Sequence, residues 1–193
     1  MHTPLATIFA LRPAARHAGF TLVELMVVLA IGGVLTATAL PSMSTMLHSQ
    51  RSTSLANGFV SSLNLARVEA IKRNARAVVC KSATGESCST TGGWEQGWIV
   101  FHDANNNAQL DEGEQIVQQQ GRLVAGPRLT GNRNVASYVS YSAVGSSKLT
   151  SGAFQSGTFT LCPASASSAV VRQIVLSPAG RPRVVNGTQA DCP

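Results

Sequence analysis

The sequence lacks the motifs from which an enzyme would be inferred. It contains no phosphate-binding loop, no nucleophile motif and no cysteine–histidine cluster with the spacing of a metal site. Beyond residue 19 the only histidines are His48 and His102, and neither lies in a recognisable catalytic motif. Aromatic residues make up only 5% of the chain, and near the basic residues of its C-terminal part they are few, namely Tyr138 and Tyr141, which argues against a base-stacking surface for single-stranded nucleic acid. We therefore expect a protein that is not an enzyme and needs no cofactor.

Charge is almost absent from residues 20–41, which read FTLVELMVVLAIGGVLTATALP. Glu24 is the only charged residue of this run, which is long enough to cross the hydrocarbon core of a bilayer as a helix. Residues 1–19 carry basic side chains and no acid, which places the N-terminus on the cytoplasmic side and residues 42–193 on the other side. A cleaved secretory signal peptide is the competing interpretation, but its apolar region would be shorter and free of an acid at its start.

The helix is expected to continue beyond Pro41, which should kink it or mark its exit from the membrane. Apolar residues then recur every three or four positions, which is the spacing of one helical face: Leu55, Phe59, Leu63, Ala66 and Ala70. This pattern predicts an amphipathic continuation over residues 42–74. Its apolar face requires a globular partner.

The region 75–193 is rich in Gly, Ser and Thr and contains short runs typical of strands. Turn signals such as Gly92-Gly93 and Gly131-Asn132 separate these runs. The expected strands are Ala77–Lys81, Trp98–His102, Gln115–Gln119, Tyr138–Ser142, Thr158–Cys162, Val170–Leu176 and Val184–Val185. We therefore predict an α+β fold, in which one long N-terminal helix packs on an antiparallel β-sheet domain.

Four cysteines lie in the region predicted to be exported: Cys80, Cys88, Cys162 and Cys192. An even number of cysteines in an oxidising space favours disulfides, and four cysteines allow three pairings. We favour Cys80–Cys88 with Cys162–Cys192, because this choice joins near neighbours and ties the C-terminal tail to a strand.

The run Gly19-Phe20-Thr21-Leu22-Val23-Glu24 and its apolar continuation resemble the N-terminal signature of type IV prepilins and pseudopilins. The resemblance implies that residues 1–19 are a leader, which a prepilin peptidase removes after Gly19. Phe20 would then become the N-methylated first residue. Glu24 would neutralise the terminal amine of a neighbouring subunit, since a buried charge needs a counter-charge. The alternative is that Glu24 only reaches toward the lipid headgroups.

Three further segments resemble the GspH/FimT family of minor pilins and pseudopilins. They are Ala66–Asn74 followed by Val78-Val79-Cys80, Gly97–Phe101 with Asp103, and Ser177-Pro178 with Gly180-Arg181. The resemblance covers essentially the whole chain and implies a type IV pilin-like fold. It also implies single-pass storage in the inner membrane, with the C-terminal domain in the periplasm, and assembly with other major and minor pilins.

Residues Gly180-Arg181-Pro182-Arg183 resemble the GRxR motif of the FimT branch, which is linked to DNA capture in natural transformation. From Gln115 onward the chain has seven basic residues and one acid, whereas residues 95–114 contain five acids and no Lys or Arg. We therefore expect the phosphate backbone of double-stranded DNA to bind here without sequence preference. The candidate residues are Arg181, Arg183, Gly180, Arg172 and Lys148. The alternative is a structural or priming minor pilin, or a type II secretion pseudopilin, whose arginines are solvated residues beside a turn.

An acidic loop offers one weak metal candidate. Its oxygen-bearing side chains fall at the ligand positions of a calcium-binding EF-hand loop: Asp103, Asn105, Asn107, Asp111 and Glu114. Ala108 occupies the position where that loop requires Gly, and the flanking residues resemble strands rather than helices. A plain polar hairpin is therefore the favoured interpretation.

Overall fold

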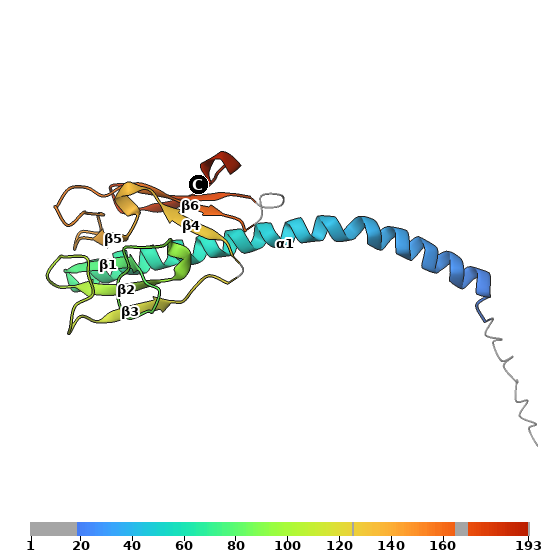
Figure 1. Ribbon diagram of the computed structural model, residues 1–193, viewed down its shortest axis with the longest axis horizontal. Coiled ribbons are helices and arrows are strands. Elements are labelled where there is room, and N and C mark those ends of the chain that lie inside the picture. The colour runs from blue at the N-terminus through green and yellow to red at the C-terminus, as the bar shows by residue number, and fades with distance from the viewer. Residues whose placement is uncertain (1–18, 125, 165–169, 193) are drawn as a thin grey trace, which may run out of the picture. The chain divides into compact units, whose positions relative to one another are not determined.

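The computed structural model describes residues 19–124, 126–164 and 170–192 (Figure 1). The chain divides into two compact units, Met1–Ser42 and Met43–Pro193. The predicted leader, apart from Gly19, lies outside the described residues. The second unit contains both disulfides and every buried residue of the described chain, so this unit carries a complete core of its own.

Helix α1 (Leu22–Arg73) is 52 residues long and continues through Pro41. Thr21 caps its start, because its Oγ1 atom accepts a hydrogen bond from the backbone N–H of Glu24 at 3.2 Å. Asn74 ends the helix in a left-handed conformation, with φ of 51°, and the N–H of Ala75 returns to the carbonyl of Ala70. The side chains of residues 37–45, 47 and 48 lie outside the described part.

Two four-stranded antiparallel sheets follow the helix. The first has the order β3-β2-β1-β5 and consists of β1 (Arg76–Lys81), β2 (Trp98–Asp103), β3 (Ile116–Gln120) and β5 (Tyr138–Tyr141). The second has the order β4-β6-β7-β8 and consists of β4 (Arg128–Gly131), β6 (Gly157–Cys162), β7 (Arg172–Leu176) and β8 (Pro182–Asn186). The predicted α+β architecture is confirmed, and each predicted run overlaps a strand. The sequence interpretation missed β4.

The second half of α1 supplies one side of the core. Four residues of its predicted apolar stripe are fully buried, and Leu55 packs at the margin of the core. The ring of Phe59 makes edge-to-face contacts with Trp94, Trp98 and Phe159, with centroid distances of 4.8–5.2 Å. Such contacts add to the hydrophobic stabilisation of burial. The amphipathic pattern thus finds its partner within the chain.

Two disulfides staple the sheets at separate places. Cys80–Cys88 closes a short loop that follows β1, and Cys162–Cys192 joins the end of β6 to the C-terminal tail. These are the two pairings that the sequence analysis favours.

Candidate functional site

The start of α1 presents an exposed apolar surface. Phe20 is 84% exposed, and the large apolar side chains from Leu22 to Leu35 are all more than half exposed. Glu24 lies exposed in the first helical turn. The predicted membrane segment, residues 20–41, extends past the described side chains, which stop at residue 36 before resuming later in the helix. Within the part of the chain that the structure describes, no helix combines the length and the apolar character needed to cross a membrane.

The GRPR segment begins in a tight turn between β7 and β8. The N–H of Gly180 donates to the carbonyl of Ser177 at 2.9 Å, and the N–H of Ser177 donates to the carbonyl of Arg181 at 3.2 Å. Gly180 has a φ of 75°, and a Cβ atom there would lie 2.3 Å from the carbonyl oxygen of Gly145. Only glycine fits this conformation and this close approach. Gly180 is a predicted DNA-binding residue, but in the structure it is buried and is required by the conformation of the turn.

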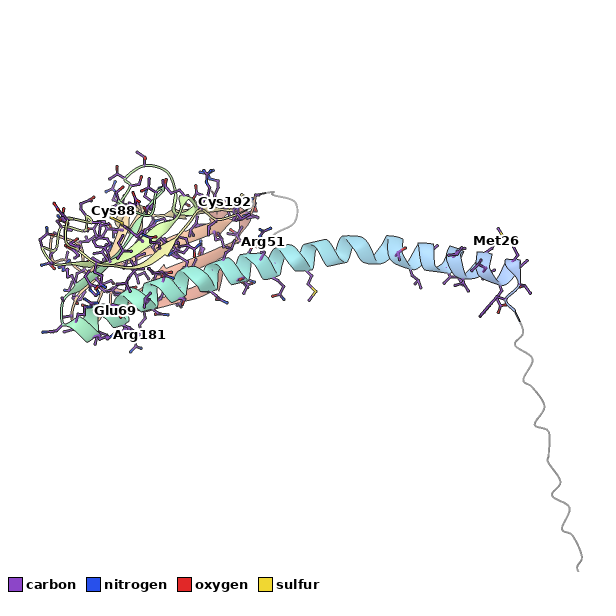
Figure 2. The ribbon with its side chains drawn as sticks, turned by 90° about the horizontal axis from the view of Figure 1, so that it is seen from below. Met26, Arg51, Glu69, Cys88, Arg181 and Cys192 are labelled. Atoms are coloured by element: carbon purple, nitrogen blue, oxygen red, sulfur yellow. A yellow bond between two sulfur atoms is a disulfide. The ribbon has the colours of Figure 1, made fainter. Side chains whose placement is uncertain are left out.

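The loop beneath this turn is held by the last turns of α1. The Nε atom of Arg67 donates to the carbonyl of Gly145 at 2.8 Å, and Ile71 lies against the same glycine. Figure 2 shows Arg181 and Glu69 at one end of the folded unit and Arg51 and Cys192 at the other. The turn that carries Arg181 is thus fixed to the end of the unit where α1 stops.

Arg181 and Arg183 are both exposed. Arg183 lies on β8, the edge strand of its sheet, opposite Val175 of β7. Arg181 lies directly before this strand, two positions from Arg183 in the sequence. Among the residues that the structure describes, neither arginine has an ion-pair partner.

The side chains of the other two predicted DNA-binding residues make contacts within the protein. Arg172 bonds through one Nη atom to Asn186 and through the other to Thr53 Oγ1 of α1 at 3.1 Å. Its Nε atom is enclosed. The Nζ atom of Lys148 lies 3.6 Å from the centre of the Phe154 ring. Arg172 therefore connects the second sheet to α1. It does not take part in the turn that carries Arg181.

The acidic and basic stretches of the sequence do not form opposite ends of the folded unit. Asp103, at the start of the acidic hairpin, pairs with Arg76 of β1 beside the end of α1. Arg122 and Arg128 line a cavity with Glu95 at the other end of the strands, where Lys81 pairs with Trp98. The late arginines are thus divided between the two ends.

The calcium candidate forms a hairpin whose carboxylates are bound by the protein itself. Asp103 accepts the N–H groups of Asn107 and Ala108, and burial raises the pKa of its carboxyl group. Asp111 accepts the side-chain amides of Asn105 and Asn107 at 2.7 Å. Glu114 accepts the N–H groups of Ala104 and Asp111. In the described chain, no group of three acidic, histidine or cysteine side chains is placed to hold a metal ion.

A cluster around Glu69 was not foreseen. Its carboxylate lies 3.3 Å from His102 Nε2 and within 3.7 Å of the Lys72 and Arg73 side chains. Burial lowers the pKa of His102, and the positive charge of Arg73 adds to that effect. Only the positions of Lys72 and Arg73, three and four residues after Glu69, are visible in the sequence, because β2 brings His102 to the helix.

These features define a class: a type IV pilin-like protein, with an apolar helical start, a helix end packed on antiparallel sheets, and an N-terminal methylation motif. The model of the prokaryotic N-terminal methylation motif matches residues 14–40. The model of the type II transport protein GspH matches residues 55–180, and the chain belongs to this family. The chain is therefore a GspH-like minor pilin or pseudopilin.

The solved structures that are similar to the chain include those of two minor pilins or pseudopilins. The type IV minor pilin FimU of Pseudomonas aeruginosa is 17% identical with a TM-score of 0.49, over 73% of this chain and 91% of that chain. The minor pseudopilin EpsH from the type 2 secretion system of Vibrio cholerae is 11% identical with a TM-score of 0.47, over 70% of this chain and 95% of that chain. No curated protein matches the chain.

Proposed function

We propose that the chain is a minor pilin that binds extracellular double-stranded DNA for uptake in natural transformation. The observation that carries this proposal is the exposed pair Arg181 and Arg183, which follows a turn packed on the Gly145 loop that Arg67 of α1 binds. The guanidinium group of arginine can bind two phosphate oxygens at once, and Pro182 restricts the backbone between the two arginines. Such contacts give affinity without sequence preference.

A gel-shift assay with the folded unit, residues 43–193, tests DNA binding. We expect binding that weakens steeply as salt rises, because neutralised phosphates release counterions. In an Arg181→Ala/Arg183→Ala variant, the plot of log affinity against log salt should become less steep, with the magnitude of its slope smaller by about 2. Arg51→Gln/Arg122→Gln is the matched control, since it removes the same charge from the other end and should bind DNA like the parent. Equal losses in the two variants would move the DNA site away from the turn.

We assign two further roles to the N-terminal residues: they hold the chain in the membrane, and they join it to other pilins in a filament. Cleavage after Gly19 by a prepilin peptidase leaves Phe20 as the first residue, and Glu24 then meets the terminal amine of a neighbouring pilin in the inner membrane or filament. N-terminal sequencing of the mature chain should begin at Phe20. A Glu24→Ala variant should still be processed but should not co-purify with filament subunits. Retained co-purification would contradict the assigned role of Glu24.

The second candidate is a structural or priming subunit of a pilus or type II pseudopilus that contacts only other pilins. The burial of Gly180 against Gly145 favours it, because packing alone accounts for a glycine at that position. Absence of any gel shift at low salt would support this candidate over the DNA-binding one.

A further inference from the structure

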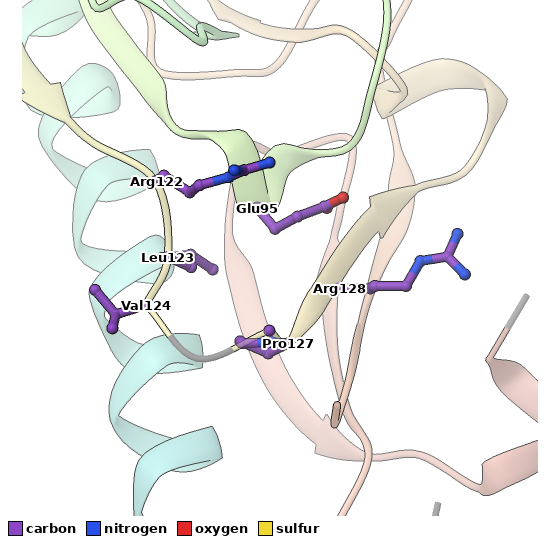
Figure 3. Close-up of a pocket in the computed structure, with 7 residues that line it drawn as sticks. Glu95, Arg122, Leu123, Val124, Pro127 and Arg128 are labelled. Carbon is purple, nitrogen blue, oxygen red and sulfur yellow. The ribbon is translucent and has the colours of Figure 1, made fainter. Parts of the chain in front are cut away.

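An arginine patch lies at the end of the folded unit where α1 enters. It comprises Arg51 of α1, Arg122 and Val124 of the segment that follows β3, and Arg128 of β4. Arg51 Nη2 donates to the carbonyl oxygen of Val124 at 3.4 Å, which connects this segment to the helix. The patch borders a cavity of about 490 Å³, and Figure 3 shows Arg122 and Arg128 on opposite sides of Glu95.

The core does not account for this patch. All three arginines are exposed, and Val124 is 74% exposed although it is apolar. Among the residues that the structure describes, the Arg122 guanidinium has no recorded hydrogen-bond or ion-pair partner. A surface that combines arginines with an exposed apolar side chain is typical of one that contacts both the phosphates and the chains of lipids.

The patch retains a net positive charge despite its acid. One carboxylate oxygen of Glu95 accepts the N–H of Leu129 at 3.0 Å. The same carboxylate also acts electrostatically on Lys81, whose ammonium group donates to the carbonyl of Gly92 at 2.7 Å. The patch thus sets three arginines against the one carboxylate of Glu95, and its net charge is positive.

We propose that this arginine patch docks on anionic phospholipid headgroups while the chain is stored in the membrane. Arg51 follows residue 41, the end of the predicted membrane segment, by ten residues, so the chain connection alone keeps the patch within roughly 35 Å of the surface that holds that segment. Arginine side chains are attracted to an anionic lipid surface, and Val124 provides a small apolar contact at the headgroup boundary. The proposal rests on the membrane-held state proposed above and is independent of DNA binding.

Vesicle co-sedimentation of residues 43–193 tests the proposal without the N-terminal anchor. The probes are vesicles of phosphatidylglycerol mixed with phosphatidylcholine and vesicles of phosphatidylcholine alone. We expect binding to the first and not to the second, with a decrease as salt screens the charges. Arg51→Gln/Arg122→Gln should lower the partition coefficient at least about tenfold. Arg181→Ala/Arg183→Ala should bind vesicles like the parent. All proteins are first compared in disulfide content and thermal midpoint.

The outcomes separate the lipid and DNA proposals because the two double variants are reciprocal controls. No binding to anionic vesicles at low salt, equal binding to neutral vesicles, or equal loss in both variants would overturn the lipid proposal. Loss of DNA binding in Arg51→Gln/Arg122→Gln with unchanged vesicle binding would make the patch a nucleic-acid surface and overturn it too. Failure of Arg181→Ala/Arg183→Ala to affect DNA would reject only the DNA site.

Discussion

The two parts of α1 are both rich in apolar residues, but they differ in where their partner lies. From Phe20 to Leu35 the large apolar side chains are exposed in the single chain. From Ala56 to Ala70 a stripe of apolar side chains is buried against the two sheets of the same chain. The first part is apolar on all sides, whereas the second has a polar face as well. The comparison teaches that the pattern around the helix, rather than its apolar content, shows whether a partner lies within the chain.

A substitution in the second part of α1 should lower the stability of the folded unit, whereas one in the first part should not, and this is the largest difference we expect. Phe59→Ala removes a ring in contact with three other aromatic rings and should cost the folded unit about 3–5 kcal/mol of unfolding free energy. Val27→Ala changes an exposed side chain and should leave the unfolding of that unit unchanged. Urea unfolding of the full-length variants in detergent measures both. A comparable loss in Val27→Ala would end the distinction between the two parts.

The next largest effect is the loss of stability on removal of a disulfide, and both disulfides lie in the second unit. Replacing both cysteines of Cys162–Cys192 by Ala should cost about 3.6 kcal/mol, because that bridge closes a loop with a sequence separation of 30. The same change at Cys80–Cys88, with a separation of 8, should cost about 2.5 kcal/mol. Urea midpoints of residues 43–193 give the order. The reverse order would show that strain or local packing, rather than loop closure, determines the contribution of each bridge.

Much of this fold was predictable, because its elements are set by local patterns. The stripe around Phe59 gave the buried face of α1, and turn signals separated most of the strands. Strand β4 was missed because its four residues contain one buried apolar side chain, Leu129, and end at Gly131, which resembles a turn. Four residues with one buried position show no alternation.

The candidate site was less predictable, since it depends on contacts between distant residues. The GRPR run identified two exposed arginines, but its glycine is required by the carbonyl of Gly145, far away in sequence. Arg172 seemed equally basic in the sequence, yet α1 and β8 supply Thr53 and Asn186 to bind it. Net charge along a segment does not show which cations are already engaged.

A smaller loss of stability is expected for substitution of Gly180, whose turn packs on the loop that the second part of α1 binds. Gly180→Ala forces a Cβ atom against the Gly145 carbonyl in a left-handed conformation, which should cost about 1–3 kcal/mol. Gly152→Ala is the matched control, because Gly152 is also left-handed, with φ of 85°, but has open space around it. Thermal unfolding should show the larger loss at Gly180. Equal losses would mean that backbone conformation alone, without the contact to Gly145, sets the cost.

The smallest expected effect is a pH dependence at the contact between His102 of β2 and Glu69 of α1. Burial and Arg73 lower the pKa of His102 below its ordinary value of 6.5, while Glu69 acts in the opposite direction. The unfolded chain therefore binds a proton at His102 more readily than the folded chain, so stability should fall as pH drops below about 6.5. His102→Gln should flatten this part of the curve of unfolding free energy against pH, measured on residues 43–193 from pH 7.5 to 5. An unchanged slope in the variant would assign the dependence to another group, such as Asp103, whose raised pKa acts in the opposite direction. A stability that rises toward pH 5 only in the protein that keeps His102 would mean that Glu69 outweighs burial.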